Sequence, residues 1–178
     1  MYRSILLAAL IVAAGAATPA VSHPRTEEFR AILTGFNEVG ALNSESGAIF
    51  TEGSGTLELK LDRRNETLTY TLRFQNLSTS VTQAHIHFGK VHMAGGVMVF
   101  FCSNLATAPA GTQPCPANGG TVTGTLTAAN VLPIAGQNVS AGDFNALADA
   151  LMTDTAYANV HTTSFPAGEI RGQVVREF

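Results

Sequence analysis

Residues 56–74 read TLELKLDRRNETLTYTLRF, and this stretch decides the fold class. Its apolar side chains recur at every second position, first at Leu57, Leu59 and Leu61 and then, after a polar turn at 63–66, from Leu68 to Phe74. In a β-strand, side chains two residues apart project from the same face. The stretch therefore predicts an antiparallel β-hairpin with one buried face and one solvated face.

Alternation or β-rich composition predicts further strands on both sides of this hairpin, and an apolar stripe at helical spacing predicts one helix. The strands are Phe29–Leu33, Val81–His87, Val97–Phe101, Thr121–Leu126, Tyr157–His161 and Glu169–Val175; the helix is Ala141–Met152, with Ser140 as its cap. Because Val97–Phe101 is apolar on both faces, we expect it to be a central strand. About eight strands and one short inserted helix indicate an all-β fold, a Greek-key β-sandwich or barrel.

The N-terminus is typical of an export signal. Arg3 precedes a short apolar run, Ile5–Ala17, and small residues follow it at Ala20 and Ser22. We therefore expect residues 1–22 to be removed as a signal peptide, leaving one domain, 23–178, that is secreted or periplasmic. No later stretch is long enough to span a membrane, so we expect no integral membrane segment. The net charge of −3, without a basic cluster, argues against nucleic acid as a partner.

Cys102 and Cys115 are the two cysteines of the chain, and they flank a loop rich in Ala, Pro, Gly and Asn. In an oxidising compartment such a pair is expected to form a disulfide that closes the loop. The alternative is that both thiolates bind a metal, although their spacing matches no zinc-binding pattern.

Three histidines carry the candidate chemistry. His85 and His87 share one face of a predicted strand, and His161 ends another. If Ile86 and Val160 point into the core, all three imidazoles face the outer wall of the barrel, provided that the two strands are neighbours. By the same alternation, Glu169, Arg171 and Gln173 would face outwards beside them.

A three-histidine set is typical of a metal site with an open coordination position. Copper is favoured by the affinity order for an all-imidazole site, zinc is the alternative, and iron ranks third. His92, in the following loop, is a candidate fourth ligand, and Tyr157 and Asn159 are candidates to support His161 through hydrogen bonds. If cleavage follows Ser22, His23 could chelate copper together with the new N-terminus. The alternative without metal is a polar network of histidines bonded to backbone carbonyls and Glu169.

Several motifs resemble the CHRD domain, the module named after chordin. They are Leu33-Thr34-Gly35 with Glu38-Val39, Ala84-His85-Ile86-His87 with Gly89, Gly124 to Leu126, Tyr157 to Thr162, and Pro166 to Gln173. The resemblance implies an extracellular or periplasmic β-domain, found alone in many bacterial proteins and in tandem in chordin, which sequesters a growth factor. Gly40 departs from the proline expected after Glu38-Val39, and the Cys102–Cys115 loop is an elaboration.

The predicted arrangement is also similar to copper-zinc superoxide dismutases, in which histidines on a Greek-key barrel bind copper and an arginine guides the anion. By this analogy we expect a copper protein in which Arg171 is a catalytic residue that attracts a small anion such as superoxide, with superoxide-dismutase-like redox activity. The alternatives are a non-catalytic interaction module and a structural zinc site. Since imidazole binds metal in its neutral form, we expect affinity to weaken below about pH 6.5.

Overall fold

The computed structural model describes residues 26–40 and 47–177, so the predicted signal peptide and His23 lie outside the described residues. The described chain is mostly β, which confirms the predicted fold class. Its elements are β1 (Glu27–Thr34), η1 (Gly35–Asn37), β2 (Ser54–Asp62), β3 (Thr67–Gln75), β4 (Val81–Phe88), β5 (Gly96–Ser103), β6 (Gly120–Thr127), η2 (Ala128–Asn130), η3 (Ala135–Gln137), α1 (Phe144–Met152), β7 (Ala156–Thr162), β8 (Ile170–Gln173) and β9 (Val175–Arg176).

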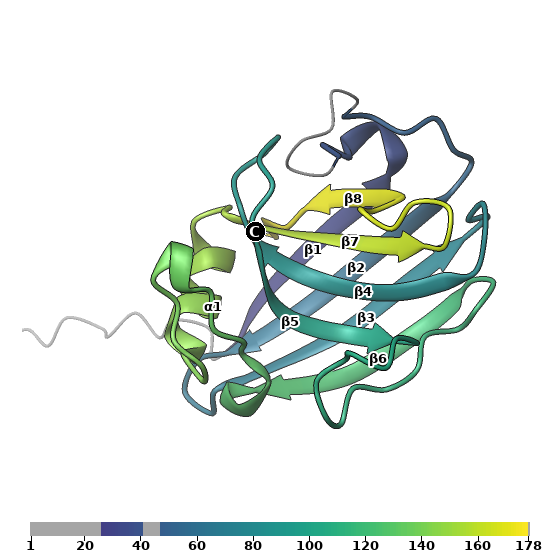
Figure 1. Cartoon of the computed structure of the whole chain (residues 1–178). Helices are drawn as coiled ribbons and strands as arrows, with labels where there is room; N and C mark the ends of the chain where they lie inside the picture. Colours follow the sequence, from purple (N-terminus) through teal and green to yellow (C-terminus); the bar gives the residue numbers. More distant parts are fainter. Residues whose placement is uncertain (1–25, 41–46, 178) are drawn as a thin grey trace, which may run out of the picture.

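The strands curl into a nearly closed antiparallel barrel in the order β5-β4-β7-β8-β1-β2-β3-β6, with β9 paired to β1 (Figure 1). The predicted hairpin is confirmed, because Leu57 pairs with Leu72, Leu59 with Tyr70 and Leu61 with Leu68. These side chains are buried in the core. The connections β3–β4, β5–β6 and β6–β7 join strands that are not neighbours in this order, as a Greek-key arrangement requires.

The strand β5 lies at one end of the sheet, so its predicted central position is wrong. Both of its faces are nevertheless covered, since the adjacent side chains of Met98 and Val99 are fully buried, and loop residues bond to its backbone in place of a second strand. Its Met98 carbonyl accepts a hydrogen bond from the Leu132 amide, and the Ser103 amide donates to the Gln113 carbonyl. A short apolar run therefore predicts that a strand is buried, but it does not indicate whether other strands or loops cover it.

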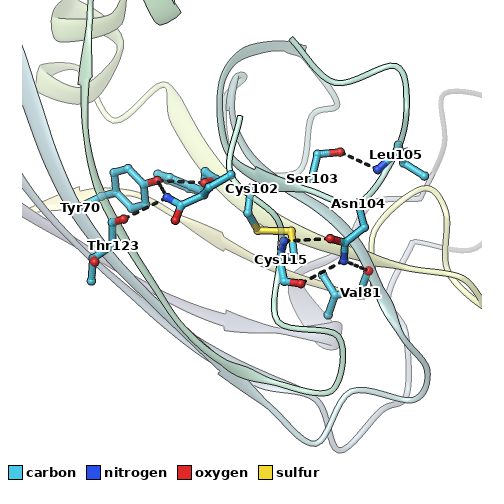
Figure 2. Close-up of a disulfide and its surroundings, with 10 residues drawn as sticks. Tyr70, Val81, Cys102, Ser103, Asn104, Leu105, Cys115 and Thr123 are labelled. Carbon is cyan, nitrogen blue, oxygen red and sulfur yellow. Dashed lines mark hydrogen bonds between the residues drawn. A yellow bond between two sulfur atoms is a disulfide. The ribbon is translucent and has the colours of Figure 1, made fainter. Parts of the chain in front are cut away.

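The predicted disulfide between Cys102 and Cys115 is confirmed, and it excludes both sulfurs as metal ligands (Figure 2). The loop that it closes fills the gap between the unpaired ends of the sheet, β5 and β6. The Gln113 amide nitrogen donates to the Thr123 carbonyl on β6 at 3.0 Å and to the Tyr70 hydroxyl at 2.6 Å. The Asn104 side chain secures the other end of the loop by donating to the Val81 and Cys115 carbonyls.

The helix α1 begins at Phe144, three residues later than the prediction. Gly142 has a φ of 80°, a left-handed conformation that a helix cannot include, so Ser140 is not the cap. Asp143 caps the helix instead, because its Oδ1 accepts the Ala146 amide at 3.0 Å. The apolar side of α1 packs into the core at one end of the barrel (Figure 1). No helix in the described part of the chain is long and apolar enough to cross a membrane.

The predicted strand Glu169–Val175 is divided into β8 and β9. Val174 interrupts it: this side chain is fully buried, and its amide donates to the Ala156 carbonyl on β7. Beyond Val174 the chain pairs with β1. β8 pairs with both β7 and β1, and the pairing with β1 continues in β9. β8 keeps the alternation that places Ile170 inside and Arg171 outside.

Removing the disulfide tests how much the 102–115 loop, which lies between β5 and β6, stabilises the barrel. We expect the double variant Cys102→Ala, Cys115→Ala to lose about 3 kcal/mol of unfolding free energy, because the cross-link restricts the unfolded chain. Urea-induced unfolding of the oxidised protein, the reduced protein and the variant measures this loss. The reduced protein is the control and should match the variant; three coincident unfolding curves would contradict the prediction.

Candidate metal centre

The antiparallel pairing of β4 with β7 brings the three predicted histidines together. His85 lies opposite Asn159, and Gln83 lies opposite His161, so both strands present these side chains on one face. The two strands lie side by side in Figure 1, in teal and yellow. The prediction that they are neighbours is confirmed. The ligand nitrogens of His85, His87 and His161 all lie within 4.8 Å of one another.

The histidines lie on the face opposite to Ile86 and Val160, as predicted, but this face is not an open exterior wall. Their exposed fractions are 2% for His85, 8% for His87 and 6% for His161. The loop between β4 and β5 and the turn between β7 and β8 cover them. The prediction of an exterior site is therefore corrected: the site lies outside the barrel sheet, beneath its loops. Alternation identifies a face of a strand but not what packs against that face.

Backbone carbonyls hold two of the three rings. The Nδ1 of His87 lies 2.9 Å from the Gly95 carbonyl, and the Nδ1 of His161 lies 2.9 Å from the Pro166 carbonyl. Since a carbonyl oxygen can only accept, each Nδ1 carries the hydrogen. In a neutral imidazole the lone pair then belongs to Nε2. Both rings therefore direct an unprotonated Nε2 away from the covering loops, which is how second hydrogen bonds orient metal-binding histidines.

The third ring is packed against the other two. The Nδ1 of His85 lies 3.3 Å from the Nε2 of His87, and its Nε2 is buried without a hydrogen-bond partner. Phe100 contacts the same ring edge-on, with centroids 4.4 Å apart. His85 is thus held by packing and offers a buried nitrogen that the described protein does not satisfy.

Burial keeps all three imidazoles neutral. It lowers the pKa of His87 to about 4 and the pKa of His161 below its usual value, and it lowers the pKa of His85 well below that value. Mutual repulsion between the rings adds to the effect on His85 and His87. Neutral imidazole is the form that binds metal. The cluster is therefore competent to bind a cation over a wider pH range than exposed histidines.

Arg171 and Gln173 fix the loop that covers His87. The Arg171 Nη2 donates to the carbonyls of Lys90 and Met93 at 3.3 and 2.9 Å, and the Gln173 side chain donates to the Gly89 carbonyl at 3.1 Å. Arg171 is buried, with 2% of its surface exposed. These bonds position the 89–95 loop, whose last carbonyl holds His87.

Tyr157 links Arg171 to the histidines. The guanidinium carbon of Arg171 lies 3.4 Å from the centroid of the Tyr157 ring, a cation–π contact. His87 stacks on the same tyrosine with centroids 4.7 Å apart and an interplanar angle of 6°. The tyrosine hydroxyl also accepts the Gly95 amide at 3.1 Å. Tyr157 therefore supports His87, whereas the sequence analysis assigned it to His161.

Glu38 is a member of the site that the sequence analysis did not identify. Its side chain lies beside Asn159 and Arg171 and is only 5% exposed. Burial raises its pKa to about 7, against the opposing effect of Arg171. A Cβ at Gly168, where φ is +127°, would come within 2.5 Å of the Glu38 Oε1, so glycine permits this approach. The Glu38-Val39 motif was the available signal, but nothing in the sequence placed it next to β7.

Two other predicted neighbours lie elsewhere. His92 is exposed, and it is not part of the group formed by the three histidines. The Glu169 carboxylate does not bond to the histidines but accepts from Thr51, from Ser78 and from Thr162. These bonds hold its pKa below the usual value despite burial. Glu169 therefore fastens the β7–β8 turn that supplies the Pro166 carbonyl.

One of three comparisons with known proteins finds a match. The family model described as CHRD domain matches residues 29–174. Searches of curated proteins and of solved structures found no match. The matched domain and the disulfide are consistent with an extracellular location. Because the match covers most of the chain, from β1 to the end of the barrel, the protein belongs to the CHRD domain family.

Proposed function

We propose that this protein is an exported metal-binding protein that holds one ion through His85, His87 and His161. The observation that carries the proposal is the convergence of three neutral imidazoles, two of them oriented by carbonyls, with ligand nitrogens within 4.8 Å. A polar network without metal would satisfy Nδ1 of His87 and His161. It would leave the buried Nε2 of His85 without a partner, which costs free energy in an enclosed site.

Copper is the favoured ion, because a site made of imidazole nitrogens has a higher affinity for Cu²⁺ than for Zn²⁺. Zinc is the alternative and would act structurally. The covering loops support a structural function as well, since the 89–95 loop and the β7–β8 turn are both bonded to the ligand rings. His92 would become a fourth ligand only if the 89–95 loop moved, because its side chain is exposed.

The decisive experiment compares metal content in two histidine variants of the signal-free protein. We expect the wild type to retain about one equivalent of copper or zinc after dialysis, and the triple variant His85→Ala, His87→Ala, His161→Ala to retain none. Elemental analysis measures both.

The matched control is His92→Ala, which removes an exposed imidazole from the adjacent loop. We expect it to bind as the wild type does; loss of metal in this variant would assign His92 to the site. Equal metal content in the wild type and the triple variant would refute the three-histidine site.

The lowered histidine pKa values predict how metal binding responds to acid. Protons compete with metal for imidazole, so a lowered pKa moves this competition to lower pH. We expect Zn²⁺ affinity to stay nearly constant from pH 8 to well below pH 6.5 and to fall only towards pH 4, where His87 becomes protonated. This revises the sequence-based expectation of a decline starting at 6.5. Competition titration with a calibrated chelator measures it; a decline complete by pH 6 would contradict burial of the ligands.

We further propose that, with copper bound, the site exchanges electrons with a small anion such as superoxide. A bound copper ion would supply the electron transfer. Arg171 is a cation near the histidines, since its guanidinium contacts Tyr157, on which His87 stacks. Because Arg171 is buried, its charge would attract an anion bound in the site through a medium of low dielectric constant.

Substitution of Arg171 tests this extension. We expect Arg171→Met to slow superoxide consumption by the copper-loaded protein by about tenfold, because an attracting charge is lost. Arg171→Lys keeps the charge and should retain more of the rate. Stopped-flow assays at two ionic strengths measure the effect, and Zn²⁺ affinity of the same variants reports damage to the site. Arg73→Met, remote on β3, is the control. No superoxide consumption by the copper-loaded wild type would reject the redox function.

An exposed aromatic pair favours a second candidate function, a non-catalytic extracellular interaction module. Phe50 is 92% exposed and Phe36 is 66% exposed, and their rings contact edge-on with centroids 6.3 Å apart. Exposed aromatic residues are enriched where proteins bind partners. An interaction module needs no metal. If the wild-type protein binds no metal in the experiment above, this second function becomes the favoured one.

A further inference from the structure

Asn159 lies at the centre of the histidine cluster. It stands on β7 two residues before His161, opposite His85 in the register of β4, and its side chain is 3% exposed. Burial lowers the pKa of His85 and His87, and hydrogen bonding to Asn159 opposes this effect. The Asn159 side chain therefore lies close to both rings. One amide oxygen is therefore close to all three imidazoles.

The contact between Asn159 and His161 brings two electron pairs together. The Asn159 Oδ1 lies 3.0 Å from the His161 Nε2. Because the Nδ1 of His161 donates to the Pro166 carbonyl, the neutral ring carries its lone pair at Nε2. An amide oxygen has lone pairs and no hydrogen. Two acceptors at this distance repel each other unless a proton or a cation lies between them, and burial lowers the pKa of the ring that would take up the proton.

The other end of the amide explains its orientation. Burial raises the pKa of Glu38, and interaction with the Asn159 side chain opposes this rise, as expected when a carboxylate accepts from an amide nitrogen. With the amide nitrogen directed at Glu38, the oxygen is directed at the histidines. The orientation is therefore set by a buried partner on the segment after β1.

The separation between Asn159 and His161 matches that between two ligands of a common ion. Ligands about 2.0 to 2.1 Å from a tetrahedral ion lie roughly 3.3 Å apart. The pair Asn159 Oδ1–His161 Nε2 is 3.0 Å apart, close to this separation. Building on the function proposed above, we propose that Asn159 is a fourth ligand, so that the site presents three imidazole nitrogens and one amide oxygen to a divalent cation.

The oxygen has a consequence for the oxidation state of the ion. Carbonyl oxygen is a hard donor that suits divalent ions, whereas Cu⁺ prefers thiolate and thioether ligands. The three histidines and Asn159 offer no sulfur, and the two cysteines are joined in the disulfide. Asn159 thus favours a divalent ion, Zn²⁺ or Cu²⁺, in the resting site.

Two substitutions at position 159 test this ligand. We expect Asn159→Leu, which has a similar size but no donor, to weaken Zn²⁺ binding by at least about tenfold and to change the visible absorption of bound Co²⁺, since one ligand is lost. We expect Asn159→Asp to bind Zn²⁺ more tightly than the wild type, because it replaces a neutral oxygen by an anionic one. Chelator competition and Co²⁺ titration at pH 7.5 provide the two readouts.

Gln83→Leu is the matched control, since it removes a half-buried amide from the same face of β4, opposite His161. It should leave both readouts unchanged. Urea unfolding of each metal-free variant identifies any that is not folded.

The outcomes separate this inference from the proposed function. If the wild type binds Zn²⁺ and Asn159→Leu binds it equally with the same Co²⁺ spectrum, Asn159 is not a ligand and the three-histidine site stands. If Asn159→Asp loses affinity as Asn159→Leu does, Asn159 acts by donating its amide hydrogens, and the inference is overturned. If the wild type binds no metal, the proposed function fails, and this inference fails with it.

Discussion

The antiparallel pairing of β4 with β7 is the constraint on which the candidate site depends. Its register sets His85 opposite Asn159 and places His161 two residue pairs further along. The side chains of His85, His87, Asn159 and His161 therefore meet on one face, while Ile86 and Val160 fill the core behind them. A shift of one residue in either strand would exchange these two sets. The same hydrogen bonds that close the barrel therefore fix the composition of the site.

The covering loops convert this polar face into a site of defined chemistry. Burial disfavours the charged form of each imidazole, and the carbonyls of Gly95 and Pro166 fix where the single hydrogen of two neutral rings lies. Each loop is held in turn by a buried charge, Arg171 for one and Glu169 for the other. Protonation state and orientation thus come from the same contacts, which is why the loops matter as much as the strands.

The sequence was sufficient for features that depend on local periodicity. Alternation predicted the β2–β3 hairpin and the faces of His85, His87 and His161, and the compartment suggested the disulfide. Features that depend on distant contacts were missed. Burial of the histidines comes from two loops far apart in the chain, and Glu38 meets Asn159 only in the folded barrel. The helix start was misplaced because Gly142 adopts a positive φ, and β5 was misplaced because loops cover it as a sheet would.

The central claim is that His87 and His161 are neutral, carry hydrogen on Nδ1 and share a cation through Nε2. Long-range ¹H–¹⁵N NMR of the imidazoles at pH 7, before and after one equivalent of Zn²⁺, tests it most directly. The account predicts Nδ1–H tautomers for both residues in the metal-free protein and a shift of both Nε2 signals with zinc. Charged rings, Nε2–H tautomers, or Nε2 signals that do not respond to zinc would contradict it.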